Sequence, residues 1–216
     1  MLLLTAVGPA SAQPDDRPPI ADLTAALQAK YDAVGSFSAD FEHTYAGGLL
    51  RTSVVERGTV QIKKPGMMRW RYTWPEEKLF VSDGESLYSY IPADRQVIVG
   101  AVPAGDNVST PALFLAGRGR LEQDFVIAYD DETDSAPQGW SLSLTPVRDD
   151  ADYVRLRLVV DRASLSFTQL RAIDFQGAVS TFDFTNLKEN ERLPDTLFAF
   201  EIPAGVDVIT ENGFGR

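Results

Sequence analysis

The 216-residue chain is 44% hydrophobic and 24% charged, a composition that supports one sizeable buried core and excludes disorder along the whole length. Its formal net charge of −11 argues against proteins that bind nucleic acid or anionic lipid headgroups by charge. The absence of cysteine and the single histidine exclude disulfides, cysteine-ligated zinc and two-histidine metal sites.

The N-terminal segment predicts export. Residues 1–12 carry no charge and end in Ala10-Ser11-Ala12, so we expect signal-peptidase cleavage before Gln13, with a start codon upstream of Met1 supplying the missing basic region. A polar tether over 13–19 and a single domain over 20–216 would follow. Because no later stretch reaches the roughly 18 apolar residues of a membrane span, we expect no stable membrane insertion. The expected compartment is the periplasm.

Hydrophobic periodicity predicts an amphipathic helix and then a series of strands. An apolar stripe at helical spacing runs from Ile20 through Leu23 and Leu27 to Val34, and Gly35 ends it. The expected strands in the first half cover 37–45, 54–63, 67–74, 79–82, 85–91 and 96–99. The strand over 67–74 has a strongly aromatic face, and Asp83-Gly84 is a strong hairpin signal.

The second half begins with a short predicted helix. Ser109-Thr110-Pro111 supplies a cap and a helix-starting proline for Ala112–Ala116, and Gly117 ends the helix. Expected strands then cover 125–129, 140–145, 153–161, 165–175 and 179–186. About ten strands with few helices predict a single domain that is mainly β. A sheet of this length curls, and we expect the two helical segments to cover its concave side and leave an apolar cavity.

Catalytic constellations are missing from the sequence. The single histidine, His43, lies on the apolar face of a predicted strand, and no Gly-x-Ser-x-Gly elbow accompanies it, so we interpret it as a satisfied core residue. The acidic run from Asp130 to Asp134 lacks the glycine and the final glutamate of a calcium loop and is interpreted as a solvated hairpin loop. We therefore predict neither an enzyme nor a cofactor.

The remaining candidate site is apolar. Any one of its residues alone fits an ordinary core, but methionine and aromatic side chains together favour a wall that adapts to flexible chains. These residues are Met67, Met68, Trp70, Tyr72, Trp74, Phe80, Tyr88, Tyr90, Leu113, Phe114, Leu115, Trp140, Phe182 and Phe184.

Several strings, in order along nearly the whole mature chain, resemble the outer-membrane lipoprotein carrier family of the LolA type. They are FSADF (37–41), GTVQIKKPGMMRWRYTWP (58–75), VSDGESLYSYIP (81–92), TPALFLAG (110–117), FDFTNLKEN (182–190) and FEIPAGVDVI (200–209). Each string is weak alone, and together they are fairly specific. The family's usual arginine before proline is Lys64 here, and an aromatic residue of the family pattern is Met68.

This resemblance implies an incomplete, half-open antiparallel β-barrel of roughly eleven strands, closed by short helices around an apolar cavity. It implies a monomeric periplasmic shuttle without cofactor, which accepts acylated lipoproteins from an inner-membrane ABC-type transporter and delivers them to an outer-membrane acceptor. Leu23 and Leu27 would belong to the lid helix, and Lys64 would be the latch that holds it shut. The implied lipid-binding residues are Phe37, Phe41, Val60, Ile62, Met68, Trp70, Tyr72, Leu87, Tyr90, Leu113, Phe114, Leu142, Leu156, Leu158, Phe182 and Phe184.

Two alternatives remain open from the sequence. The same barrel could serve as a periplasmic lipid- or lipoprotein-sensing regulatory module, although such sensors usually carry a second domain, for which this chain has no room. The second alternative is a binding module for another apolar ligand. Identification of copurifying lipoproteins by mass spectrometry separates these hypotheses.

Overall fold

The computed structural model describes residues 17–47, 52–102, 112, 115–117, 119–130, 139–148 and 151–211. The predicted signal segment, most of the tether and the predicted lining residues Leu113 and Phe114 lie outside these residues. The predicted second helix is described at Ala112 and 115–117, where the Ala116 amide donates to the Ala112 carbonyl at 2.9 Å. In the described part of the chain, no helix has the length and apolarity needed to span a membrane.

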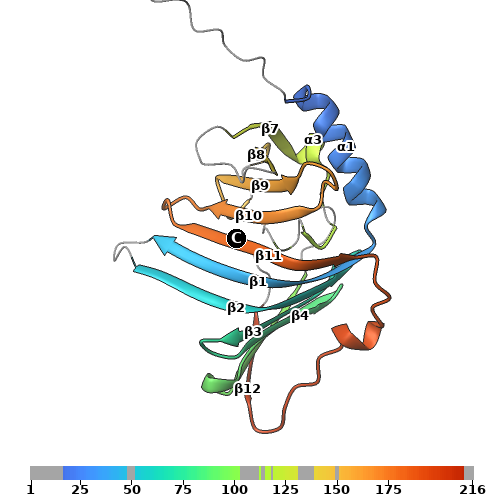
Figure 1. The fold of residues 1–216 in the computed structure, drawn as a ribbon. Helices are drawn as coiled ribbons and strands as arrows, with labels where there is room; N and C mark the ends of the chain where they lie inside the picture. Colours follow the sequence, from blue (N-terminus) through green and yellow to red (C-terminus); the bar gives the residue numbers. More distant parts are fainter. Residues whose placement is uncertain are drawn as a thin grey trace, which may run out of the picture.

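One large sheet dominates the structure (Figure 1). Its strands are β1 (Ser36–Gly47), β2 (Thr52–Lys63), β3 (Met67–Trp74), β4 (Lys78–Asp83), β5 (Ser86–Ile91), β6 (Gln96–Ala101), β7 (Phe125–Tyr129), β8 (Gly139–Pro146), β9 (Arg155–Asp161), β10 (Phe167–Ile173), β11 (Val179–Glu189) and β12 (Asp207–Glu211). The helical elements are α1 (Ile20–Ala33), α3 (Leu121–Asp124), η1 (Pro92–Asp94) and η2 (Asp195–Phe198).

The strand order is β12-β6-β5-β4-β3-β2-β1-β11-β10-β9-β8-β7, so β1 joins the two halves of the chain. All neighbouring strands are antiparallel except β12, which pairs with β6 in parallel. The sheet curls without closing, and this half-open barrel confirms the predicted fold class. The sequence analysis missed β12, because a five-residue strand that extends an edge carries a weak periodic signal.

The concave face of the sheet holds the main apolar core. Strand alternation brings the side chains of Phe37, Val60 and Trp70 to this face, together with Leu142 and Leu158 from the second half of the chain. Figure 1 shows α1 (blue) at one end of the curled sheet, beside α3 and β7. Its buried residues, Leu23, Leu27 and Tyr31, belong to the same core. The predicted helical stripe and strand alternation are therefore confirmed.

A second, smaller apolar cluster lies on the opposite face, under the segment that follows β11. Phe198 is 1% exposed, and Val81 and Val97 are fully buried. The ring of Phe200 packs against Tyr88 at 5.2 Å and against Tyr90 at 5.9 Å between centroids. This segment therefore covers the convex side of β4 to β6 before it joins the sheet as β12.

We expect Phe198→Ala to lower the free energy of unfolding by about 3 kcal/mol or more, because it removes a buried aromatic ring and leaves a cavity. Urea unfolding measures this change, and limited proteolysis should show faster cleavage between residues 191 and 206. Ile202→Ala is the control, since Ile202 in the same segment is 44% exposed. Equal small effects of both substitutions would contradict the packing of this segment.

The structure corrects the interpretation of Asp130. This residue is 8% exposed, and its carboxylate lies 3.1 Å from Nε of the buried Arg157. The same Nε donates to the Ser141 hydroxyl at 2.9 Å. Asp130 therefore pairs with a buried guanidinium and is not part of a solvated loop; residues 131–138 lie outside the described part of the chain.

Candidate functional site

The candidate site is the concave face of β1 to β5 and β8 to β11, together with its cover α1. The cross-strand register places opposite residues on the same face: Val60 pairs with Trp70, and Trp70 with Phe80. Of the implied lipid-binding residues in the described strands, all except Tyr90 belong to the concave core or pack against it. Three further residues of the predicted apolar wall, Met67, Trp74 and Tyr88, do not belong to this core: Trp74 is 49% exposed, and the Tyr88 ring packs on Phe200.

Tyr90 is wrong as a lining residue. It pairs with Leu79, which pairs with Arg71, and this row lies on the face opposite to Trp70 and Phe80. Its ring contacts Phe200 on the convex side. Most side chains of this strand, Leu87, Tyr88, Tyr90 and Ile91, are large and apolar, so alternation within the strand could not indicate which of them faces inward.

An aromatic cluster occupies the middle of the concave face. The ring of Phe41 lies 5.3 Å from Trp70 and 4.9 Å from Tyr72 between centroids, both in edge-to-face geometry. Gly58 makes this approach possible, because a Cβ there would lie 2.0 Å from the Arg71 carbonyl oxygen and 2.8 Å from the Phe41 ring. The close packing at this register shift in β2 therefore leaves room only for glycine at position 58.

His43 marks the polar end of this face. Its ring stacks on Phe182 with centroids 4.1 Å apart, and Nε2 lies 2.7 Å from the Ser180 hydroxyl. Nδ1 lies 3.4 Å from a Glu56 carboxylate oxygen. Burial lowers the pKa of His43, and the Glu56 carboxylate opposes that shift. His43 is therefore a half-buried residue whose ring nitrogens both lie near polar partners, as the interpretation of a satisfied residue expects, but it lies outside the buried core.

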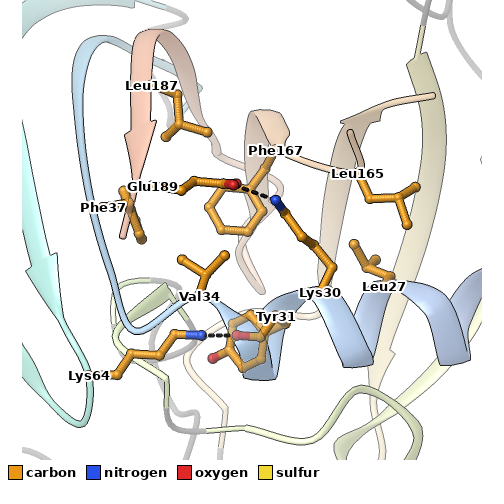
Figure 2. A pocket seen from close by; sticks show the side chains of 10 residues that line it. All are labelled: Leu27, Lys30, Tyr31, Val34, Phe37, Lys64, Leu165, Phe167, Leu187 and Glu189. Atoms are coloured by element: carbon orange, nitrogen blue, oxygen red, sulfur yellow. Dashed lines mark hydrogen bonds and ion pairs between the residues drawn. The ribbon is translucent and has the colours of Figure 1, made fainter. Parts of the chain in front are cut away.

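Polar contacts hold the cover α1 in place, and they surround a region where apolar side chains of α1 and the sheet pack together. Lys30 forms an ion pair with Glu189 of β11, and the Gln28 side chain accepts a hydrogen bond from the Leu121 amide of the neighbouring helix α3 at 2.8 Å. Figure 2 shows Leu27, Val34 and Phe37 facing the small cavity between helix and sheet. This cavity has a volume of about 10 Å³, which is at most room for one water molecule. At this contact α1 is therefore closed against the sheet.

Lys64 lies in the turn between β2 and β3 and reaches α1. Its ammonium donates to the Tyr31 carbonyl of α1 and lies 3.4 Å from the centroid of the Tyr31 ring (Figure 2). The neighbouring Gly66 amide donates to the Ala116 carbonyl at 2.9 Å. The predicted contact between Lys64 and the helical cover is present; its action as a latch stays a prediction.

Gly117 and Lys30 were not recognised as site residues in the sequence. Gly117 adopts a φ of +88°, and a Cβ there would lie 2.6 Å from two carbons of the Lys64 side chain. Its position after the predicted helix indicated only a helix end. No local sequence pattern indicates that the Lys64 side chain packs closely against Gly117. The Lys30 to Glu189 pair spans 159 residues, beyond the reach of any local pattern.

The Lys64 contact predicts a pH dependence. Burial lowers the pKa of Lys64 to about 8, against the opposing effect of Asp32 and Glu189, whereas an unfolded lysine titrates near pH 10.4. Between these values the folded protein binds fewer protons than the unfolded chain, so the penalty of burying the charge is complete below about pH 8 and is relieved as the pH rises. We expect wild type to gain stability relative to Lys64→Leu between about pH 7 and about pH 9.5. Urea unfolding of both proteins measures this; an unchanged difference contradicts the burial of the ammonium.

The fold and its covered apolar face define a half-open β-barrel protein with an apolar, helix-capped interior. The family model described as "Outer membrane lipoprotein carrier protein LolA" matches residues 32–201. The chain belongs to this family.

Individual relatives agree with that assignment. An outer-membrane lipoprotein carrier protein of Nitrosospira multiformis is 33% identical over 182 residues, which cover 80% of this chain and 81% of the relative. The corresponding protein of Dechloromonas aromatica is 32% identical over 155 residues, 71% of each chain. Among solved structures, an uncharacterized conserved protein from Thermus thermophilus matches with a TM-score of 0.53 and 13% identity, covering 88% of this chain and 99% of that one; this similarity concerns the fold alone.

Proposed function

We propose that this chain is a periplasmic carrier that binds the acyl chains of lipoproteins on its concave face and covers that face with α1 when it is empty. Membership of the lipoprotein carrier family supports the cargo class. The observation that carries the proposal is a continuous apolar concave face beneath a cover that Lys64 and Lys30 attach by polar contacts.

The physical need for a carrier follows from the cargo. Burying one methylene group is worth about 0.8 kcal/mol, so an acyl chain exposed to water costs on the order of 10 kcal/mol. A lipoprotein would therefore cross an aqueous compartment very slowly without a protein that shields its chains. The net charge of −11 disfavours adsorption of the shuttle to anionic membrane surfaces.

In the closed structure the cavity at α1 is far too small for an acyl chain. Uptake of a chain between α1 and the sheet then requires α1 to move away from the sheet, and delivery allows it to return. We place the loading step at an inner-membrane ABC-type transporter and the unloading step at an outer-membrane acceptor. Both steps exchange one apolar environment for another, so neither requires catalysis by the carrier.

Copurification tests the proposal. Protein isolated from its native periplasm should carry many different lipoproteins, identified by mass spectrometry, and a bound apolar fluorescent probe should be displaced by acylated but not by deacylated lipoprotein. Equal displacement by both forms would contradict an acyl-chain site. A single regulatory partner in place of many lipoproteins would favour the sensing module.

A further inference from the structure

The indole N–H of Trp70 is a buried donor without an acceptor. The side chain is 6% exposed, and among the described residues no group accepts a hydrogen bond from its Nε1. Buried tryptophan N–H groups usually have a partner, because an unsatisfied donor loses its hydrogen bond to water on burial. Trp70 lies on the concave face, in the middle of β3. The unpaired N–H donor therefore lies on the face that the cargo is proposed to occupy.

The surroundings of Trp70 explain why the protein does not satisfy this donor itself. Its ring lies 5.3 Å from Phe41, 5.2 Å from Phe182 and 6.4 Å from Phe184 between centroids. Phenylalanine side chains offer no oxygen or nitrogen acceptor. The described aromatic side chains around the ring therefore supply no acceptor for Nε1, and a ligand on this face can bring one.

We infer that the Trp70 indole N–H is a specificity-determining donor that binds the carbonyl oxygen at the head of a cargo acyl chain. This inference rests on the proposed carrier function and adds to it a preference for acyl over alkyl chains. Every acyl chain ends in a carbonyl group, whereas an ether-linked alkyl chain of the same length offers only a weak ether oxygen. The donor can therefore distinguish two ligands whose apolar parts are the same.

The polarity of the concave face gives the ligand a direction. Tyr72 follows Trp70 by two residues on the same face, about 7 Å along the strand, and its hydroxyl lies 3.4 Å from His43 Nδ1. Next to them, Lys78 Nζ lies 2.5 Å from the Glu56 carboxylate. With its carbonyl at Trp70, a ligand would place its polar part near these groups.

The other half of the barrel suits the hydrocarbon. The concave side chains of β8 and β9 include Leu142, Leu144, Leu156 and Leu158, each at most 1% exposed. These leucines continue the apolar surface away from the polar cluster of His43 and Lys78. The chain of the ligand would then run from the aromatic half of the barrel into the aliphatic half.

Trp70→Phe is the test, because phenylalanine keeps an aromatic ring and removes the donor. Two synthetic lipopeptides are compared by displacement of an apolar fluorescent probe: one carries two palmitoyl esters, and the other carries hexadecyl ethers in the same positions. Wild type should bind the ester about three- to tenfold more tightly, the range expected for one net hydrogen bond. Trp70→Phe should bind both with equal affinity. Trp74→Phe is the control and should keep the preference, since Trp74 is 49% exposed and stacks under Arg57.

The indole proton provides a direct second measurement. In ¹H–¹⁵N spectra the Trp70 Nε1–H resonance, assigned by its loss in Trp70→Phe, should move downfield when the ester ligand binds and should not do so with the ether. Equal affinities of wild type for both ligands, or an ester preference that survives in Trp70→Phe, would overturn the inference and leave the carrier function intact. Failure of wild type to bind either lipopeptide would instead contradict the carrier function itself.

Discussion

Lys64→Leu is expected to keep the fold and the uptake of lipoproteins while slowing their delivery about tenfold. The ammonium of Lys64 donates to the Tyr31 carbonyl and lies over the Tyr31 ring, and a hydrogen bond to a charged donor contributes about 1.5 to 3 kcal/mol. Burial of the charge opposes this gain, as the lowering of the pKa of Lys64 to about 8 indicates. A net loss of about 1.4 kcal/mol of closure corresponds to a factor of ten.

The expected slowing follows from linkage between the cover and the cargo. Acyl chains bind the open form of the carrier. Their apparent affinity is therefore lower when more of the empty carrier is closed, in proportion to the fraction that remains open. Without the Lys64 contacts the open form is more populated, the chains are held more tightly, and transfer to the acceptor is less favourable. Lysine has no planar fork of donors as arginine has, so this latch is expected to open more easily than in relatives with arginine.

Reconstituted transfer of lipoprotein from loaded carrier to acceptor-bearing membranes measures the effect. Lys63→Leu is the matched control, because it removes the same charge one residue earlier, from a side chain that binds the Leu193 carbonyl at 3.1 Å and Asp195 at 2.5 Å. Delivery by Lys64→Leu at the wild-type rate would make Lys64 an ordinary turn residue. Equal slowing by both variants would point to net charge instead of the latch.

Leu27→Glu is expected to release α1 from the sheet. Leu27 is 3% exposed and lines the small cavity with Phe37 and Phe167 (Figure 2). A carboxylate introduced there has to lose its hydration in apolar surroundings, which destabilises the closed form by about 3 to 5 kcal/mol. Since α1 can swing outward with its new charge, the loss is limited to the free energy with which the helix docks.

An apolar fluorescent probe should bind Leu27→Glu several-fold more strongly than wild type, because the concave face becomes accessible. Ala26→Glu is the control: it adds the same charge to an exposed position of the same helix. Burial raises the pKa of a carboxyl group, so lowering the pH protonates the new glutamate and should partly restore closure. Similar probe binding by both variants would show that the α1 contact does not cover the apolar face.

The sequence alone determined the elements and the inward residues of most strands. The alternation along β1 and β3 and the stripe of α1 are local patterns with periods set by backbone geometry, and each matches the observed burial. The hairpin at Asp83-Gly84 was predictable for the same reason, since Gly84 adopts a φ of +101° that glycine adopts without steric strain. The family strings supported the half-open barrel and its cover.

The tertiary structure decided what depends on partners distant in the chain. The register between β4 and β5 determines which face of the sheet Tyr90 lies on. The sequence of an apolar strand without alternation does not indicate that face. The pairing of Asp130 with Arg157, the parallel addition of β12 to β6 and the passage of Lys64 beneath Gly117 join segments that share no local pattern. The unsatisfied Trp70 N–H belongs to the same class, because an acceptor is absent only with respect to all described neighbours in the folded core. Periodicity indicates which side chains leave water, whereas the contacts they then make are set by how the sheet curls.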